Sequence, residues 1–274
     1  MVPAGDKAVH DLLDFYLEAG VDALLGEEPV DRFAVETSAV EHTLAPRLAP
    51  PPSPTLPHKG GGSERPAIVS APPPPDAAAM EARQAAKSAT SLEELRAILE
   101  TFGGCALKAT ATQLVFADGN PQSRVMLVGE APGRDEDIEG LPFVGRSGKL
   151  LDRMLSAIGL DRTQVYIANV VPWRPPGNRT PTPQETQICL PFTLRQIELA
   201  DPDILVCLGG PSAQTLLGTK DGITKTRGRW FTFNTGTRDI RAMPTFHPAF
   251  LLRSPLQKRF AWRDFLAIKK ALAG

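Results

Sequence analysis

The sequence predicts an α/β fold, a three-layer α/β/α sandwich around a central four-stranded parallel sheet. Short apolar runs that are typical of buried strands alternate with longer segments whose apolar residues recur at helical spacing. The strand-like runs are residues 125–128, 165–171, 204–208 and 242–246, and the helical segments are residues 148–158, 183–199, 211–217 and 256–272. Strands and helices that alternate in this way build a parallel sheet with helices on both faces. Ligands of such sheets bind at the carboxyl ends of the strands, so function is expected in the loops that follow them.

Two helix starts carry recognisable local signals. Ser91 and Glu94 form a capping-box pattern ahead of apolar residues at helical spacing, which predicts a further helix that reaches about Phe102. Thr182 and Glu185 repeat this pattern at the start of the helix that precedes the third strand-like run. Both helices are therefore predicted from capping as well as from periodicity.

A proline-rich segment divides the chain. Between Pro46 and Pro75 lie 11 of the 27 prolines, together with a run of three glycines. Prolines hold the backbone extended and do not pack a core, so residues 46–78 are predicted to be a linker. Residues 79–274 then form the main domain.

Residues 1–45 are predicted to be a short helical appendage. Apolar side chains recur at helical spacing in its first part, at Val9, Leu12, Leu13, Tyr16 and Leu17. A single short helix is too small to fold alone. We expect it either to dock on the main domain or to bind a partner protein.

The net charge of −1 is unevenly distributed. Residues 1–78 hold 5 basic and 12 acidic side chains, a net charge of −7, whereas residues 79–274 hold 25 basic and 19 acidic side chains, a net charge of +6. The basic excess permits a polyanionic partner without requiring one.

Apolar runs and cysteines bear on the compartment. No apolar run approaches the roughly 18 to 20 residues of a membrane span, and Asp6 lies where a signal peptide has basic residues, so no membrane association is expected. The three scattered cysteines, Cys105, Cys189 and Cys207, are too few for a disulfide framework, which fits a reducing compartment. We expect a cytoplasmic monomer.

The loop after the first predicted strand concentrates carboxylates. Residues 129–137 read GEAPGRDED, in which glycine and proline hold the backbone tight and leave amides free for an anionic or carbonyl ligand. Alone, such a loop is as often a magnesium site or a solvated turn as a catalytic centre. The chain continues into residues 140–148, GLPFVGRSG, where Phe143 is poorly placed for the core and well placed to stack on a planar ligand.

Five motifs occur in order along the main domain. They are GEAPGRDED at 129–137, GLPFVGRSG at 140–148, Asn169 at a strand end, RPPGNRTP at 174–181 and HPAFLLRSP at 247–255. Over about residues 100–273 the chain thereby resembles the family 4 uracil-DNA glycosylases of the bacterial and archaeal type. The resemblance implies an enzyme that flips uracil out of DNA, hydrolyses its N-glycosidic bond and leaves an abasic site.

The resemblance implies a role for each residue of the base pocket. Phe143 would supply a face for the uracil ring, with Gly129 and Ala131 beside it. The amide of Asn169 would address N3–H and O4 together, which cytosine presents with the opposite polarity. His247 would donate to O2 as negative charge gathers there. Without the other motifs, Asn169 would read as a turn residue and His247 as a structural histidine.

The catalytic carboxylates are implied less directly. Family 1 enzymes carry a water-binding aspartate and a thymine-excluding tyrosine at positions that correspond here to Ala131 and Gly133. The resemblance to family 4 makes Glu130 and Glu136 the candidates, with Glu136 beside the C5 edge or steering water onto C1′ and Asp135 as a substitute. A carboxylate near C1′ also stabilises an oxocarbenium-like sugar without a metal.

DNA contacts are expected on the rim of this pocket. The expected residues are Ser147, Arg174, Arg179, Leu251, Leu252 and Arg253. The serine begins a helix whose amides suit a phosphate, and the leucines are expected on a loop from which they wedge into the base stack. The arginines supply positive charge, although each also reads as ordinary solvated surface.

The cysteines depart from the family pattern. Family 4 enzymes hold a four-iron cluster on a Cys-x-x-Cys pair, a cysteine just before the Arg-Pro-Pro segment and a fourth in the following helix. Cys105 and Cys189 remain, whereas Lys108 and Trp173 occupy the other two positions. A cluster of the normal kind cannot be built, so we expect no metal and no cofactor. Trp173 is expected to fill the space and Lys108 to turn its ammonium into water.

Two rival functions remain at this point. One is a protein that binds uracil or abasic sites in DNA without turnover, or with slow turnover. The other is a metal-dependent phosphohydrolase that uses the acidic loop, which is disfavoured because no His or Asp triplet supplies a facing set of ligands.

Overall fold

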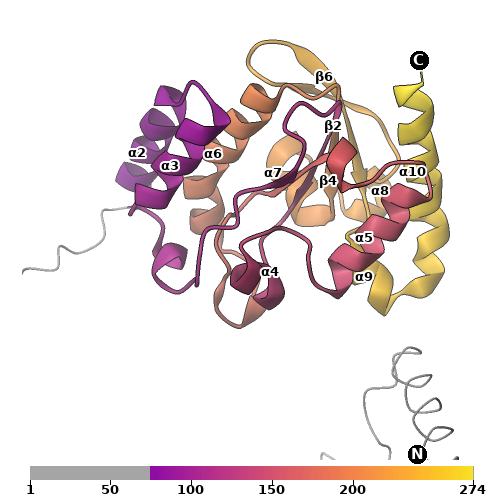
Figure 1. The fold of residues 1–274 in the computed structure, drawn as a ribbon, viewed down its shortest axis with the longest axis horizontal. Helices are drawn as coiled ribbons and strands as arrows, with labels where there is room; N and C mark the ends of the chain where they lie inside the picture. The colour runs from indigo at the N-terminus through magenta and orange to yellow at the C-terminus, as the bar shows by residue number, and fades with distance from the viewer. Residues whose placement is uncertain (1–74, 274) are drawn as a thin grey trace, which may run out of the picture. The chain divides into compact units, whose positions relative to one another are not determined.

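The computed structural model describes residues 75–273, and within them a mixed sheet lies between two layers of helices (Figure 1). Its strand order is β1-β3-β2-β4-β6-β5. The strands are β1 (Asp118–Gly119), β2 (Val125–Gly129), β3 (Tyr166–Asn169), β4 (Ile204–Leu208), β5 (Phe231–Asn234) and β6 (Asp239–Thr245). The α/β/α sandwich is confirmed.

The four predicted strands form the parallel centre of this sheet. β2 pairs with β3 and β4, and β4 pairs with β6, all in parallel. The predicted count of four is wrong for the whole sheet, because β1 and β5 add antiparallel edges. β1 has only two residues and β5 alternates apolar with polar residues, so neither shows the continuous apolar run of a central strand.

Helices cover both faces of the sheet. They are α2 (Pro75–Ser88), α3 (Leu92–Thr101), α4 (Arg134–Glu139), α5 (Arg146–Ser156), α6 (Pro183–Ala200), α7 (Gly210–Leu217), α8 (Ile223–Thr226), α9 (Pro248–Arg253) and α10 (Lys258–Leu272). Successive side chains of a strand point to opposite faces, which explains the layers. Met126 and Val128 of β2 pack with α2, α3, α6 and α7, whereas Val125 and Leu127 pack with α5 and α10.

The predicted caps are present. Ser91 Oγ accepts from the N–H of Glu94 at 3.2 Å. Thr182 Oγ1 accepts from the N–H of Glu185 at 3.2 Å, and the Glu185 carboxylate accepts from the N–H of Thr182 at 2.7 Å. The capping box is complete only at Thr182, because the Glu94 carboxylate accepts from the N–H of Thr90 at 2.7 Å and not from that of Ser91.

Some elements differ from the sequence prediction. α2 was not predicted, and it begins at Pro75, so the last four residues of the expected linker (46–78) are helical. α4 and α9 were taken as loops and α8 was not predicted, because helices of four to six residues are too short to show a period. The helical appendage expected over 1–45 and the rest of the linker lie outside the described residues.

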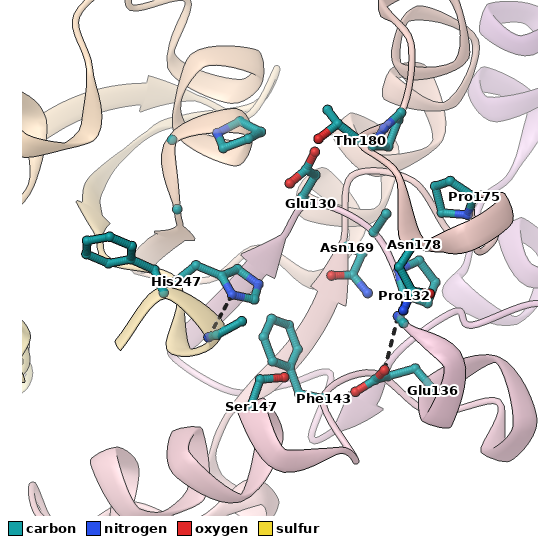
Figure 2. Close-up of a pocket in the computed structure, with 18 of the residues that line it drawn as sticks. Glu130, Pro132, Glu136, Phe143, Ser147, Asn169, Pro175, Asn178, Thr180 and His247 are labelled. Carbon is teal, nitrogen blue, oxygen red and sulfur yellow. Dashed lines mark hydrogen bonds between the residues drawn. The ribbon is translucent and has the colours of Figure 1, made fainter. Parts of the chain in front are cut away.

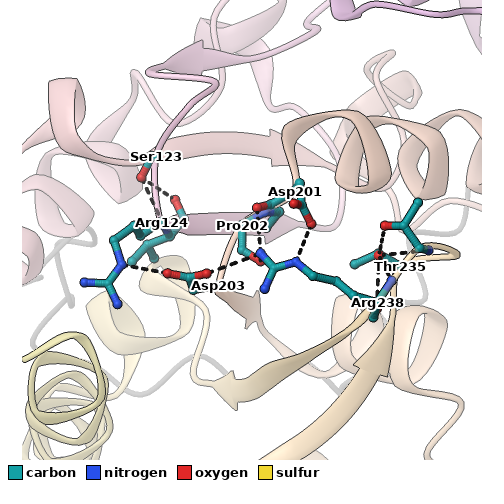
Figure 3. A network of polar contacts seen from close by, with 9 residues as sticks. Ser123, Arg124, Asp201, Pro202, Asp203, Thr235 and Arg238 are labelled. Carbon is teal, nitrogen blue, oxygen red and sulfur yellow. Dashed lines mark hydrogen bonds and ion pairs between the residues drawn. The ribbon is translucent and has the colours of Figure 1, made fainter. Parts of the chain in front are cut away.

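An ion-pair network ties together the amino ends of the central strands (Figure 3). Arg124, which precedes β2, pairs with Asp203, which precedes β4, at 2.6 Å. Arg238, which precedes β6, reaches Asp201 at 2.6 Å and Asp203 at 3.2 Å. These ion pairs lie at the amino ends of the strands, which is opposite to the end where ligands of parallel sheets bind.

Within the described residues, no helix is both long enough and apolar enough to span a membrane.

Candidate uracil-binding site

A cavity of about 600 Å³ opens at the carboxyl ends of the parallel strands (Figure 2). Glu130 follows β2, Asn169 ends β3, Gly209 follows β4 and His247 follows β6, and all four line it. Parallel strands bring their carboxyl ends to one edge, so residues far apart in the sequence converge there. The structure thus assembles most of the predicted base-pocket residues in one place.

The side-chain amide of Asn169 lines the cavity and is buried. The side chain is 5% exposed, and its Oδ1 atom is buried with no hydrogen-bond partner among the described residues. A buried polar atom left unsatisfied is costly, which marks it as a site for a ligand donor. Gly129 makes room for it, because a Cβ there would overlap Asn169 Oδ1 and lie 2.7 Å from the Phe143 ring.

Phe143 belongs to the core as well as to the cavity. It is 4% exposed and packs with Leu127 and Leu151, so the prediction that it is poorly placed for the core is wrong. Its backbone is held at φ 56°, and its carbonyl accepts from the guanidinium of Arg162. The ring also lines the cavity, with its centroid 5.4 Å from that of the His247 ring. Core packing therefore fixes a ring that faces the cavity.

His247 is held in one tautomer. It is the N-cap of α9, and its Nδ1 atom accepts from the backbone N–H of Ala249 at 3.1 Å. An accepting Nδ1 leaves the proton of the neutral ring on Nε2. Burial, and secondarily the charge of Arg253, lowers the pKa of His247 to about 4. At neutral pH the ring is an uncharged donor through Nε2.

Of the two carboxylates that line the cavity, Glu130 forms fewer hydrogen bonds than Glu136. Its Oε1 atom is buried and has no hydrogen-bond partner among the described residues. Burial raises the pKa of Glu130, and the hydroxyl of Thr180 partly offsets that rise. Figure 2 shows Glu130 below Thr180, at the side of the cavity opposite Ser147. One oxygen of this carboxylate therefore remains available to a ligand or a water molecule.

The carboxylate of Glu136 is occupied by hydrogen bonds from neighbouring backbone N–H groups. Its carboxylate accepts from the N–H groups of Gly133 at 3.0 Å, Val144 at 3.1 Å and Gly145 at 3.1 Å. These bonds tie the start of α4 to the start of α5, so Glu136 lines the cavity mainly as a brace. Asp135 is exposed and is not among the lining residues, which argues against its predicted catalytic role.

The expected DNA-contacting residues divide into two groups. Ser147, Arg179 and Arg253 line the cavity, whereas Arg174, Leu251 and Leu252 do not. Arg253 is exposed, but Arg179 forms a two-point ion pair with Glu185 at 2.7 and 2.8 Å. Arg174 donates to Asn178 Oδ1 at 2.7 Å.

The wedge predicted for Leu251 is not supported. This side chain lies on α9, not on a loop, and is fully buried against Phe246 and Ala261. Leu252 is half-buried on the same helix. A six-residue helix that starts with a proline shows no clear period, so the sequence did not reveal which leucine points inward.

Several cavity residues were not singled out from the sequence. They include Asn178, Thr180, Pro211, Ile223 and Phe250. Asn178 adopts φ 56° directly after Gly177, and Gly-Asn is a recognised turn signal, so this residue could have been found. Ile223 and Phe250 carry no chemical signal that marks them.

The four cluster positions do not form a ligand set. Trp173 is a fully buried core side chain that packs in the same apolar cluster as Cys105 and Cys189. Lys108 does not turn into water as predicted: its ammonium binds the carbonyls of Glu100 at 2.5 Å and Phe102 at 3.0 Å, at the end of α3. A cation on these free carbonyls stabilises the helix end. An indole and an engaged ammonium supply no iron ligand, so these positions do not fit a four-iron cluster.

The described residues contain no group of three or more His, Cys, Asp or Glu side chains placed to hold a metal ion.

A model of the uracil DNA glycosylase superfamily matches residues 116–266, which include the carboxyl ends of all four parallel strands. The chain belongs to this superfamily.

Individual relatives of the superfamily agree with this assignment. The type-4 uracil-DNA glycosylase of Thermotoga maritima is 46% identical over 151 residues, which cover 55% of this chain and 77% of that protein. That of Archaeoglobus fulgidus is 38% identical over 182 residues, 65% of this chain and 92% of the relative. That of Sulfurisphaera tokodaii is 40% identical over 185 residues, 66% and 84% respectively. The resemblance that the five motifs indicated is confirmed.

Proposed function

We propose that this chain removes uracil from DNA by hydrolysing the N-glycosidic bond of deoxyuridine, and that it leaves an abasic site in an intact strand. The observation that carries the proposal is the buried Oδ1 of Asn169, which has no hydrogen-bond partner among the described residues and lies beside the ring of Phe143. The relatives are named type-4 uracil-DNA glycosylases and match over most of their length. Binding of uracil or abasic sites without turnover is not favoured.

Asn169 and Phe143 would select the base. N3–H of uracil donates to Asn169 Oδ1, and the Asn169 amide donates to O4. Cytosine places an acceptor at N3 and a donor at C4, so it would leave the buried oxygen facing another acceptor. A site built around such a buried group rejects the wrong partner strongly. The Phe143 ring offers the planar face on which the base rests.

His247 would stabilise the leaving base. When the C1′–N1 bond breaks, the electron pair leaves with the base and charge spreads onto O2. The Nε2–H of neutral His247 is a fixed donor for that oxygen, since Nδ1 is already bound to Ala249. A preorganised donor in a site shielded from water stabilises developing charge without reorganising.

Glu130 would act on the sugar side. The C1′–N1 bond breaks as the water oxygen bonds to C1′, and a proton of that water passes to the free oxygen of Glu130. While ionised, the same carboxylate stabilises positive charge on the sugar. Glu136 would brace the loops, because both of its oxygens already accept backbone hydrogen bonds.

Ser147 and Arg253 are proposed as contacts to DNA phosphates at the rim of the cavity. Ser147 lies in the first turn of α5, and Arg253 is exposed at the end of α9. Arg179 would first have to exchange its ion pair with Glu185 for a phosphate. Cationic contacts of this kind position DNA without reading its sequence.

A panel of oligonucleotides, each with one uracil, cytosine or thymine, tests the function. We expect release of free uracil alone and a strand that breaks only after alkali. No lysine lines the cavity in the described part of the chain, so no Schiff base with C1′ is expected. Retention of uracil DNA without release would support the binding alternative, and a borohydride-stable adduct would contradict a monofunctional enzyme.

We further propose that the protein acts as a cytoplasmic monomer and that residues 1–45 serve as a docking segment for the main domain or for a partner protein. The scattered cysteines support the reducing compartment. Light scattering of the full chain, alone and with uracil DNA, tests the oligomeric state.

A further inference from the structure

Two buried thiols face each other outside the base pocket. The Sγ atom of Cys189 lies 3.8 Å from that of Cys105, toward which it donates a weak hydrogen bond. Cys105 is 2% exposed and Cys189 is fully buried. Cys207, the third cysteine, lies on β4 close to Ser212 and takes no part in this contact.

The two thiols lie on segments that are far apart in the chain. Cys105 precedes a short 3₁₀ turn (Ala106–Ala109) after α3, whereas Cys189 lies in the second turn of α6, 84 residues later. Their sulfurs must approach from 3.8 Å to about 2.05 Å to form a disulfide. Cys105 is not in an α-helix, and Gly103 and Gly104 lie between it and the end of α3, so the backbone that carries it is less constrained than that of α6.

We propose that Cys105 and Cys189 are a site of oxidation at which hydrogen peroxide produces an intramolecular disulfide. The buried position favours a small oxidant. Because the Cys189 thiol donates toward it, Cys105 sulfur is the better nucleophile. It attacks one peroxide oxygen, the O–O bond breaks, and sulfenic acid and water form.

Cys189 then completes the reaction. Its thiol loses a proton and attacks the sulfenic sulfur of Cys105, the S–O bond breaks, and a second water leaves. Overall, two thiols lose two electrons and two protons, and one peroxide becomes two waters. The product is a covalent tie between the segment after α3 and α6.

This tie would stabilise the folded domain. A cross-link across a loop of 84 residues restricts the unfolded chain far more than the folded one. The same apolar cluster also contains Trp173. We expect oxidation to raise the Tm by a few degrees to about 10 °C.

Thiol counting on the full chain tests the proposal. The protein is exposed to peroxide, unfolded, labelled with iodoacetamide and weighed by mass spectrometry. We expect one labelled cysteine, Cys207, after oxidation and three after subsequent reduction. A peptide digest should join the Cys105 and Cys189 peptides with a mass two hydrogens below their sum.

Variants make the result specific. Cys207→Ser should still lose two thiols, leaving none to label, whereas Cys189→Ser should form no internal link and show no rise in Tm. Circular dichroism checks that each variant is folded. Three labelled thiols after peroxide, a disulfide between two chains, or a sulfinic acid at Cys105 with Cys189 free would overturn the proposal. None of these readouts depends on uracil excision.

Discussion

Gly129 and the Oδ1 atom of Asn169 lie so close together that a β-carbon at residue 129 would overlap that oxygen. The same β-carbon would lie 2.7 Å from the Phe143 ring. Residue 129 ends β2, pairs with Asn169 across the sheet and has no positive φ, so the requirement for glycine comes from the cavity and not from the backbone. One small residue thereby leaves room for both groups proposed to hold the base.

Gly129→Ala should lower uracil release much more than it lowers stability. The methyl group displaces the Asn169 amide or the Phe143 ring, and a displacement near 1 Å of a positioning group costs about 10²-fold in rate. Gly103→Ala is the matched control, since a Cβ there meets nothing within 4 Å. Single-turnover rates and Tm values of both variants provide the measurement. Equal rates for Gly129→Ala and the parent would show that the site tolerates a side chain at residue 129.

The two glutamates that line the cavity should differ in their effect on rate and stability when each is changed to glutamine. Glu130→Gln should reduce the excision rate by at least about 10²-fold, because a general base and a charge that stabilises the sugar are lost together. Its Tm should hold or rise, because a desolvated carboxyl is removed.

Glu136→Gln should lower the stability of the domain more than it lowers the excision rate. An amide has one acceptor oxygen where the carboxylate serves three backbone N–H groups, so we expect a loss of about 1 to 3 kcal/mol in the free energy of unfolding. Urea unfolding and single-turnover excision, measured on the same two proteins, distinguish the roles. A larger rate loss in Glu136→Gln than in Glu130→Gln would reverse our assignment.

The free energy of unfolding should depend on pH in part through the protonation of His247. Its pKa is about 4 in the folded chain, against an ordinary value of 6.5, because burial disfavours the charged ring. Between pH 6.5 and 4 the unfolded chain binds a proton here that the folded chain does not, so the free energy of unfolding falls as the pH is lowered through that window. His247→Gln should weaken this fall. Urea unfolding at pH 7, 6 and 5 measures it, and equal slopes in both proteins would argue that the ring titrates normally.

The replacement of the cluster by packing can be tested directly. Trp173→Ala should destabilise the domain by about 3 to 5 kcal/mol, since it empties a fully buried indole site. Cys189→Ser should be milder and should keep excision. Purified protein should lack iron and sulfide, and treatment with a chelator should leave uracil release unchanged. About four iron atoms per chain, or absorbance near 400 nm that Cys189→Ser abolishes, would contradict this account.

The central strands and the strand-end residues could be predicted from the sequence for one physical reason. A strand buried on both faces is a continuous apolar run, and parallel topology then brings the residues at or just after the ends of these strands together, as happens for Asn169 and His247. Edge strands and one-turn helices lack such a signal, so β1, β5 and α9 were not found.

The details of the site depended on three-dimensional contacts. Nothing local in the sequence says that Glu136 accepts from Val144 and Gly145, or that Leu251 points into the core. The contact of Lys108 with the end of α3 likewise follows from how two segments pack. Such roles belong to pairs of residues, and a pattern along one chain cannot define them.

The central claim is that one pocket, in which Asn169 recognises uracil and His247 stabilises its departure, performs the excision. It is tested most directly by single-turnover uracil release from one oligonucleotide by the parent, Asn169→Ala and His247→Ala, with DNA affinity measured beside each rate. We predict rates lowered by roughly 10²- to 10³-fold for each variant, because each loses a preorganised contact to the departing base, and smaller changes in Kd. Release at the parental rate by both variants would place the pocket elsewhere and contradict the account.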